Sequence, residues 1–381
     1  MIRMKLPTAS HWFSAGPFSA AAFLLFIYCQ APVDAPDTLS SYTEIESVWQ
    51  YLKAYSIYQG RIPADPFVFG TSTALLKSIN DTLGGNYYTA YGRADSIDVS
   101  QSALLAAGDL SSASAGASLA PGPNSTVFLD TLTDSVALIT IWTFDSETVY
   151  SDFRYCMSAA SRFPALVINV RNNRGGYINQ ADSIIAALVP AGTAYVQARE
   201  RDYDGDAKKF VTIDWHSWVT RYGPRPEFQG KRFAVLMNGY SASASEITAA
   251  ALYEGVHALL IGERSYGKGI GQVEIIRRRD TRYVEPYLIR KKLIVTYLQL
   301  RGVSQRIGNY HHAGIQPDTI PPAYIAQASG LPSEWQRQVF YAVKMLDSTA
   351  TPASISYPPE RDSLGFNKTT ESGLSKVIYE E

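Results

Sequence analysis

Short apolar runs alternate with helical patterns in the middle of the chain, and this alternation constrains the fold more than any other feature. Residues 165–170, 233–237 and 258–261 are almost wholly apolar, which is typical of strands buried on both faces of a parallel sheet. Residues 178–188 and 244–253 lie between such runs and have apolar side chains at helical spacing. This order of strands and helices predicts an α/β core made of βαβ units.

Weaker patterns extend the core at both ends. A hairpin is expected from the alternation on either side of residues 133–135. The remaining expected elements are helices at 149–162 and 333–346, strands at 272–276 and 293–300, and two early helices at 43–58 and 71–83. The second of these early helices ends at a pair of glycines, and together the two predict a small N-terminal helical region.

These elements divide the 381-residue chain into segments. The expected order is a signal segment (1–29), the helical region (36–92), a linker rich in Ser, Ala, Gly and Pro (93–126), the core (127–325), a C-terminal helix (326–348) and a flexible polar tail (349–381). The charged and aromatic stretch at 194–231 has no assignment from its pattern.

The first 29 residues resemble a secretory signal. Arg3 and Lys5 precede an apolar segment at 18–28, which is too short to span a bilayer of about 30 Å at 1.5 Å per residue. An uncleaved anchor would need the longer stretch 12–28. Cys29 stands where a bacterial lipoprotein carries its lipid, although the residues before it are large. Lipidation of Cys29 and later cleavage of the signal therefore both stay open.

Composition narrows the classes of partner. Hydrophobic residues make up 46% of the chain and charged residues 18%, as in globular proteins. The net charge is −1 and basic residues do not cluster, which argues against a nucleic-acid partner. Only Cys29 and Cys156 are present, so no disulfide framework is expected, and Cys156 is expected to be a buried small side chain.

Ser243 lies in the small-residue turn NGYSASASE at 238–246, between an expected strand and an expected helix. This geometry lifts a hydroxyl above a sheet, and the helix N-terminus supplies unpaired N–H groups that could hold an oxyanion. Serines at a helix start are also ordinary caps, so this segment alone leaves both interpretations open.

Lys268 lies between two glycines after the strand at 258–261. A buried lysine loses its proton more readily, and a neutral amine can accept a proton from a serine hydroxyl. A phosphate-binding loop is the alternative, but the spacing and the final hydroxyl residue that such a loop requires are both missing here.

Gly175 and Gly176 end the segment RNNRGG, between an expected strand and an expected helix. Paired glycines allow backbone amides to point into a cleft, as an oxyanion site requires. A plain strand-to-helix turn would have the same appearance.

Together these segments resemble the carboxy-terminal processing, or tail-specific, serine peptidases. The resemblance covers roughly residues 136–318 and also includes GIQPD at 314–318. It implies a crotonase/ClpP-like core and peptide-bond hydrolysis near protein C-termini without a cofactor. It implies Ser243 as nucleophile, Lys268 as base, Gln272 as the residue that orients the lysine, and backbone amides of Gly175 or Gly176 and of Ala244 as oxyanion donors.

Two features depart from that family. Many members carry a PDZ domain before the core, and the stretch between residues 91 and 136 is too short for one. Arg174 stands where the family usually has proline, so its side chain could reshape the pocket or pair with a substrate carboxylate.

Histidine and metal chemistry are not expected. No histidine lies in a triad-like segment, and His311 and His312, if on a strand, would point to opposite faces. The sequence therefore predicts a serine endopeptidase without metal or cofactor, acting on proteins or peptides as an exported periplasmic or lipid-anchored protein of a bacterial envelope. The alternative is an inactive peptide-binding or scaffold protein of the same fold.

Overall fold

The structure is a computed structural model, and it describes residues 44–83, 89–93, 120–121, 124, 126–224, 226–277, 291–319, 333–361 and 376–380. The expected signal segment with Cys29 and most of the expected linker lie outside these residues. Within them, no helix combines the length and the apolar character that a membrane span needs.

A six-stranded sheet forms the centre of the core, in the order β2-β3-β4-β5-β8-β9. Its strands are β2 (Ala120–Pro121), β3 (Val127–Thr131), β4 (Val136–Ile141), β5 (Ala165–Asn169), β8 (Arg232–Met237) and β9 (Leu259–Gly262). From β4 to β9 neighbouring strands are parallel, and the three apolar runs seen in the sequence supply β5, β8 and β9. The predicted α/β fold is confirmed.

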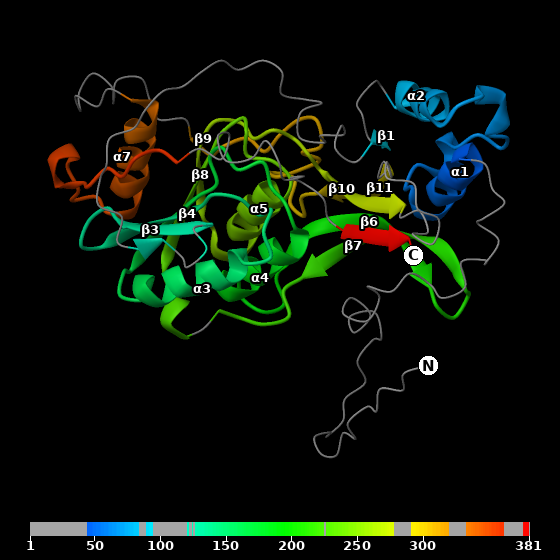
Figure 1. Cartoon of the computed structure of the whole chain (residues 1–381). Helices are drawn as coiled ribbons and strands as arrows, with labels where there is room; N and C mark the ends of the chain where they lie inside the picture. Colours follow the sequence, from blue (N-terminus) through cyan, green and yellow to red (C-terminus); the bar gives the residue numbers. More distant parts are fainter. Residues whose placement is uncertain are drawn as a thin grey trace, which may run out of the picture. The chain divides into compact units, whose positions relative to one another are not determined.

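Helices cover both faces of this sheet (Figure 1). The helices are α3 (Val149–Ala160), α4 (Ile178–Leu188), α5 (Ala244–Val256) and α7 (Glu334–Leu346). The first three share one buried core with the sheet, and α7 packs on the other face against a separate apolar cluster. Cys156 of α3 is a buried side chain, as expected, and its Sγ lies 3.6 Å from Val127 O. Helix α5 continues past the expected end at residue 253 to Val256, and its C-cap residue His257 has a left-handed backbone (φ 52°).

The unassigned stretch after residue 193 supplies two strands, β6 and β7, of a second sheet ordered β12-β10-β11-β6-β7, with β1 paired to β11. Its strands are β1 (Ala90–Arg93), β6 (Ala194–Asp204), β7 (Lys209–Val219), β10 (Ile270–Arg277), β11 (Lys291–Arg301) and β12 (Lys376–Glu380). Strand β7 is largely exposed and β6 is fully buried only near its start, so charged and aromatic residues mask the alternation of this hairpin. This explains why its sequence carries no clear strand signal.

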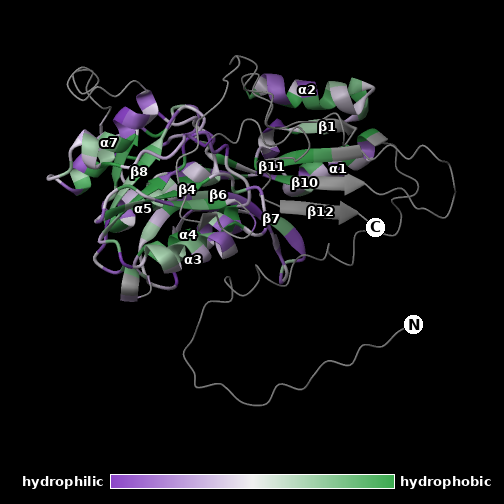
Figure 2. Cartoon of the chain, turned by 60° about the vertical axis from the view of Figure 1, so that its left-hand side comes forward, coloured by the Kyte–Doolittle hydropathy of each residue, from purple (hydrophilic) through white to green (hydrophobic). Residues whose placement is uncertain are grey.

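The N-terminal helical region is present. Helices α1 (Glu44–Tyr55) and α2 (Ser72–Thr82) bury their apolar faces with residues of β10 and β11. Figure 2 shows α2 with hydrophobic and hydrophilic residues on different faces. The Thr71 hydroxyl caps α2 by accepting a hydrogen bond from Ala74 N at 3.1 Å.

The C-terminal segment differs from the expected flexible tail starting at residue 349. Its residues 350–361 lie against the core, with a short 3-10 helix at Pro352–Ser354. Ala350 and Ile355 are buried in the apolar cluster under α7. Beyond the gap in the described residues, β12 pairs in parallel with β10. The polar composition of this segment conceals apolar anchors that are spaced without periodicity.

Candidate active site

The turn before α5 holds Ser243 in an unusual backbone conformation. Its φ is 55° and its ψ is −117°, and the residue is 3% exposed. A non-glycine residue with positive φ is strained, and such strain persists only where the surroundings fix it. Strand β8 ends at Met237 and α5 begins at Ala244, so the turn has the strand–turn–helix form that the sequence predicts.

The serines on either side of Ser243 have structural roles. Ser241 Oγ donates to Val170 O at 2.7 Å, and Ser245 Oγ donates to Asn173 O at 2.8 Å. Both hydroxyls tie the turn to the loop after β5. Within the described residues, Ser243 Oγ donates to no backbone carbonyl, which makes it the hydroxyl of the three that is left for chemistry.

Glu246, in the first turn of α5, joins the serine turn to the lysine loop. Its carboxylate is buried, and one oxygen, Oε2, accepts from Ser243 N at 2.9 Å and from Lys268 N at 2.7 Å. The other oxygen accepts from Ser265 Oγ at 2.5 Å and from Gly267 N at 2.7 Å. Because two amides share one oxygen, the backbones of Ser243 and Lys268 must lie side by side.

Burial shifts the pKa values of both Lys268 and Glu246. It lowers the pKa of Lys268 to about 8, while the negative charge of Glu246 acts in the opposite direction. Burial likewise raises the pKa of Glu246 to about 7, and the four hydrogen bonds that the carboxylate accepts oppose that rise. The amine of Lys268 can therefore be neutral at mildly alkaline pH.

Gln272 follows on β10 and is 1% exposed. A bulge between Gly271 and Gln272 shifts the pairing of β10 with β11, so Gln272 lies opposite Thr296. The bulge changes the direction of the side chains that follow the lysine loop. The role of Gln272 in orienting the lysine stays a prediction.

Gly175 lies directly against the serine turn. Its φ is 96°, and a Cβ there would come within 2.7 Å of Ala242 O, 2.8 Å of Ser243 Cβ and 3.0 Å of Ala244 N. No other residue could approach the turn so closely. The amide of Gly175, however, donates to Asn173 Oδ1 at 2.9 Å.

Gly176 forms a parallel bridge with Phe144, in which Phe144 bonds the two neighbours of the glycine. In such a bridge the N–H of Gly176 itself points away from Phe144. Neither this amide nor that of Ala244 donates a hydrogen bond within the described residues. Of the three expected oxyanion donors, Gly176 and Ala244 are thus available, and Gly175 is already engaged.

Asn173 is a fully buried support that the sequence analysis missed. Its Nδ2 donates to Ile141 O at 2.8 Å, and its carbonyl accepts from Ala242 N at 3.1 Å. It also holds Ser245 and Gly175 as described above. The asparagine within RNNRGG was the available signal, since a buried carboxamide can satisfy several backbone groups at once.

Arg174 lies beside this loop, and its Nε is a buried atom without a hydrogen-bond partner among the described residues. Burial and the negative charge of Glu246 raise the pKa of Tyr266, and the positive charge of Arg174 opposes that rise. A buried donor without an acceptor is costly, which makes this position suited to an anionic ligand group.

The two adjacent histidines differ from the expectation. They lie in a turn and not on a strand, with ring centroids 3.9 Å apart, so they do not point to opposite faces. Burial, together with the neighbouring His312, lowers the pKa of His311 to about 4, and His311 Nδ1 lies 3.3 Å from Gly267 O. His312 N donates to the same carbonyl oxygen of Gly267 at 2.8 Å, so both histidines contact the lysine loop. The described residues contain no group of three or more potential ligands that could hold a metal ion.

The segments that form this site also match known proteins. Residues 135–320 match the model of peptidase family S41. The carboxy-terminal processing protease CtpB of Bacillus subtilis is 34% identical over 140 residues, which are 36% of this chain and 26% of that protein. A probable CtpA-like serine protease of Staphylococcus haemolyticus is 25% identical over 251 residues, 65% of this chain and 46% of that protein.

Among solved structures, the photosystem II D1 C-terminal processing protease is similar at 13% identity and a TM-score of 0.48, covering 81% of this chain and 98% of that one. The chain spans between about a quarter and about half of the length of the two bacterial relatives it matches.

Proposed function

We propose that the chain is a serine endopeptidase with Ser243 as nucleophile and Lys268 as general base, since residues 135–320 match the model of peptidase family S41. The observation that carries the proposal is the shared oxygen of Glu246, which brings the amides of Ser243 and Lys268 together. The lowered pKa of Lys268 adds a supply of neutral amine.

The reaction proceeds in two halves. Neutral Lys268 accepts the Ser243 proton while Oγ bonds to the peptide carbonyl carbon, and the amides of Gly176 and Ala244 hold the oxyanion. The C–N bond then breaks, and the leaving amine takes the proton from Lys268. In the second half, a water gives its proton to Lys268 and attacks the acyl-enzyme, which releases the new carboxylate and restores Ser243. Gln272 orients the lysine amine.

The substrates proposed are proteins or peptides, cleaved near their C-termini as the names of the relatives indicate for those proteins. The basic and apolar N-terminal segment supports export to a bacterial envelope, with Cys29 as a candidate lipid anchor. Mass spectrometry of the mature N-terminus distinguishes a lipidated cysteine from later cleavage.

The test compares hydrolysis of an unstructured protein by wild type, Ser243→Ala and Lys268→Ala. Each substitution is expected to lower kcat by at least about 10³-fold, because the nucleophile and base act as a unit. Ser245→Ala is the matched control, since this hydroxyl lies two residues from Ser243 and donates to Asn173 O of the loop after β5, and the variant should keep activity within about tenfold.

The competing function is a scaffold that binds peptides without cleaving them. It would be supported if wild type cleaves nothing that Ser243→Ala leaves intact while both bind the same peptides. An essential histidine among His257, His311 and His312 would instead overturn the assignment of Lys268 as base.

A further inference from the structure

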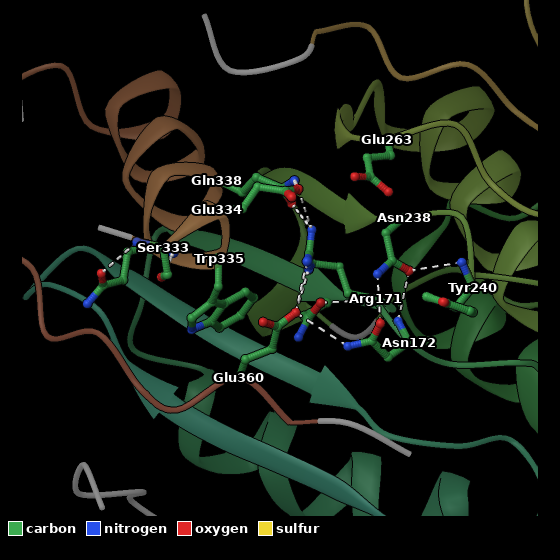
Figure 3. Close-up of polar contacts among 12 residues, drawn as sticks. Arg171, Asn172, Asn238, Tyr240, Glu263, Ser333, Glu334, Trp335, Gln338 and Glu360 are labelled. Carbon is green, nitrogen blue, oxygen red and sulfur yellow. Dashed lines mark hydrogen bonds and ion pairs between the residues drawn. The ribbon is translucent and has the colours of Figure 1, made fainter. Parts of the chain in front are cut away.

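A buried arginine begins the glycine loop, residues 171–176, and its guanidinium contacts side chains of α7. Arg171 is 6% exposed and lies two residues after the end of β5. Its guanidinium donates to Glu360 Oε1 at 2.8 and 3.2 Å and to Gln338 Oε1 at 2.5 Å, and Glu334 Oε1 lies 3.4 Å away. Figure 3 shows Arg171 between Glu360 and the side chains of α7.

The main carboxylate partner comes from the C-terminal segment, residues 350–361. This segment is fixed at several points before it reaches Glu360. Trp335 Nε1 donates to Pro358 O at 2.7 Å, and Ser356 N donates to Leu132 O at 2.9 Å. The buried side chain of Ile355 adds an apolar anchor. Glu360 is thus delivered to Arg171 by a docked segment and not by a free tail.

The same carboxylate also reaches the next residue of the loop. Asn172 Nδ2 donates to Glu360 Oε1 at 3.3 Å, and Asn172 has a left-handed backbone with φ 59°. Asn172 N donates to Asn238 Oδ1 at 3.0 Å, and Asn238 Nδ2 donates back to Asn172 Oδ1 at 2.7 Å (Figure 3). This reciprocal pair ties the end of β5 to the end of β8.

Asn238 opens the turn that carries the nucleophile. Its carboxamide oxygen accepts from Tyr240 N at 3.2 Å, and its backbone N–H donates to Ser241 Oγ at 3.0 Å. An unbroken series of polar contacts therefore runs from Glu360 through Asn172 and Asn238 to the serine turn. The glycine loop begins at Arg171, so the same carboxylate acts on both loops that frame Ser243.

We propose that Glu360 is a positioning residue of the peptidase site: its carboxylate, through Arg171 and Asn172, sets the loops 171–176 and 238–243 in their reactive arrangement. This inference rests on the proposed function. Glu360 touches no reacting atom and acts only through Arg171 and Asn172. A displacement of about 1 Å in a group that frames the reaction can lower the rate about 100-fold, so loss of this contact should affect turnover.

The experiment measures steady-state kinetics and active-site labelling by a serine-directed fluorophosphonate for wild type and Glu360→Gln. The expected result is a fall in kcat of about 10- to 100-fold with KM changed less than about threefold, because the loops are displaced while the substrate-binding surface remains. The conservative variant Glu360→Asp should recover part of kcat. Arg361→Gln is the matched control, because Arg361 is the residue next to Glu360 but pairs with Asp130 of β3 and contacts neither loop. The kcat of this variant should equal that of wild type.

A second variant and a second measurement keep the outcome decisive. Asn172→Gly preserves the left-handed backbone but removes the carboxamide, and should lower kcat like Glu360→Gln. Hydrogen exchange of the Ala242 amide, which bonds Asn173 O, should be faster in Glu360→Gln than in Arg361→Gln. Equal kcat or equal loss in Glu360→Gln and Arg361→Gln overturns the inference. Failure of the proposed function is seen separately, as wild type that cleaves nothing while the exchange difference persists.

Discussion

Two buried charged side chains, Glu246 and Arg171, support the candidate site. They differ in how far along the chain their partners lie. Glu246 lies at the start of α5, within 22 residues of everything it binds, and its four donors belong to the serine turn and the lysine loop. Arg171 receives its carboxylate from Glu360, which is 189 residues away along the chain. The first contact set is local in sequence, and the second depends on where the C-terminal segment docks.

This difference indicates what a substitution near Glu246 and a substitution near Arg171 should each change. On the Glu246 side the contacts fix the reacting groups themselves, so a change there should act on chemistry and on pH dependence. On the Arg171 side the contacts reach the same loops through Asn172 and Asn238. A change there should act on turnover through loop position, and on stability through the docked segment.

The largest effect is expected at Gly175, where the glycine loop meets the serine turn. In Gly175→Ala the new Cβ would press on Ala242 O, Ser243 Cβ and Ala244 N, all within 3.0 Å. We expect kcat to fall about 10³-fold, because the nucleophile and an oxyanion donor are displaced together. Stopped-assay hydrolysis of an unstructured protein measures it. Gly192→Ala is the control: its φ is 81° but nothing lies within 4 Å, so it shares the backbone penalty alone and should keep full kcat.

The next effect concerns pH and Glu246. Because the pKa of Lys268 is about 8, kcat/KM of wild type should fall about tenfold per pH unit below 8, as the amine becomes protonated. In Glu246→Gln the carboxamide cannot accept from all four donors, so kcat should drop about 100-fold. Removing the negative charge also removes the interaction that raises the lysine pKa, so the acid limb should move to lower pH. A shift to higher pH would contradict this arrangement.

The pH dependence of folding stability should reflect the shifted pKa values of Lys268 and Glu246. The pKa of Lys268 is lower in the folded chain, so the unfolded chain binds the extra proton between pH 8 and 10.5, and stability from this group rises with pH there. The pKa of Glu246 is raised, so its contribution falls as pH rises from 4.5 to 7. Thermal unfolding of wild type and Glu246→Gln across pH measures both. Glu254→Gln is the control, since Glu254 lies on the same helix and only accepts from Ser304 N.

The sequence predicted the Glu246 side better than the Arg171 side, for a physical reason. Strands β5, β8 and β9 are buried on both faces, so their apolar runs identify them, and the turns that follow them carry Ser243, Lys268 and Gly175 at readable spacings. Glu246 was also within reach, because a glutamate three residues after a serine at a helix start is a capping pattern. The hairpin β6–β7 and the segment 350–361 depend on long-range contacts made by polar stretches, and such contacts leave no periodic signal.

The smallest effect should come from Trp335, which holds the docked segment and meets the loops only where its ring faces the Arg171 guanidinium. Trp335→Phe keeps an aromatic ring near Arg171, whose guanidinium lies 6.0 Å from the ring centre, but removes the hydrogen bond to Pro358 O. We expect about 1 kcal/mol of lost stability and a fall in kcat of less than about threefold. Denaturant unfolding followed by kinetics on the folded fraction measures both. Trp215→Phe, on the exposed hairpin, is the control and should change neither. If Trp335→Phe lowers kcat as much as Glu360→Gln does, the segment acts as one rigid body, and the charge of Glu360 is not the element that positions the loops.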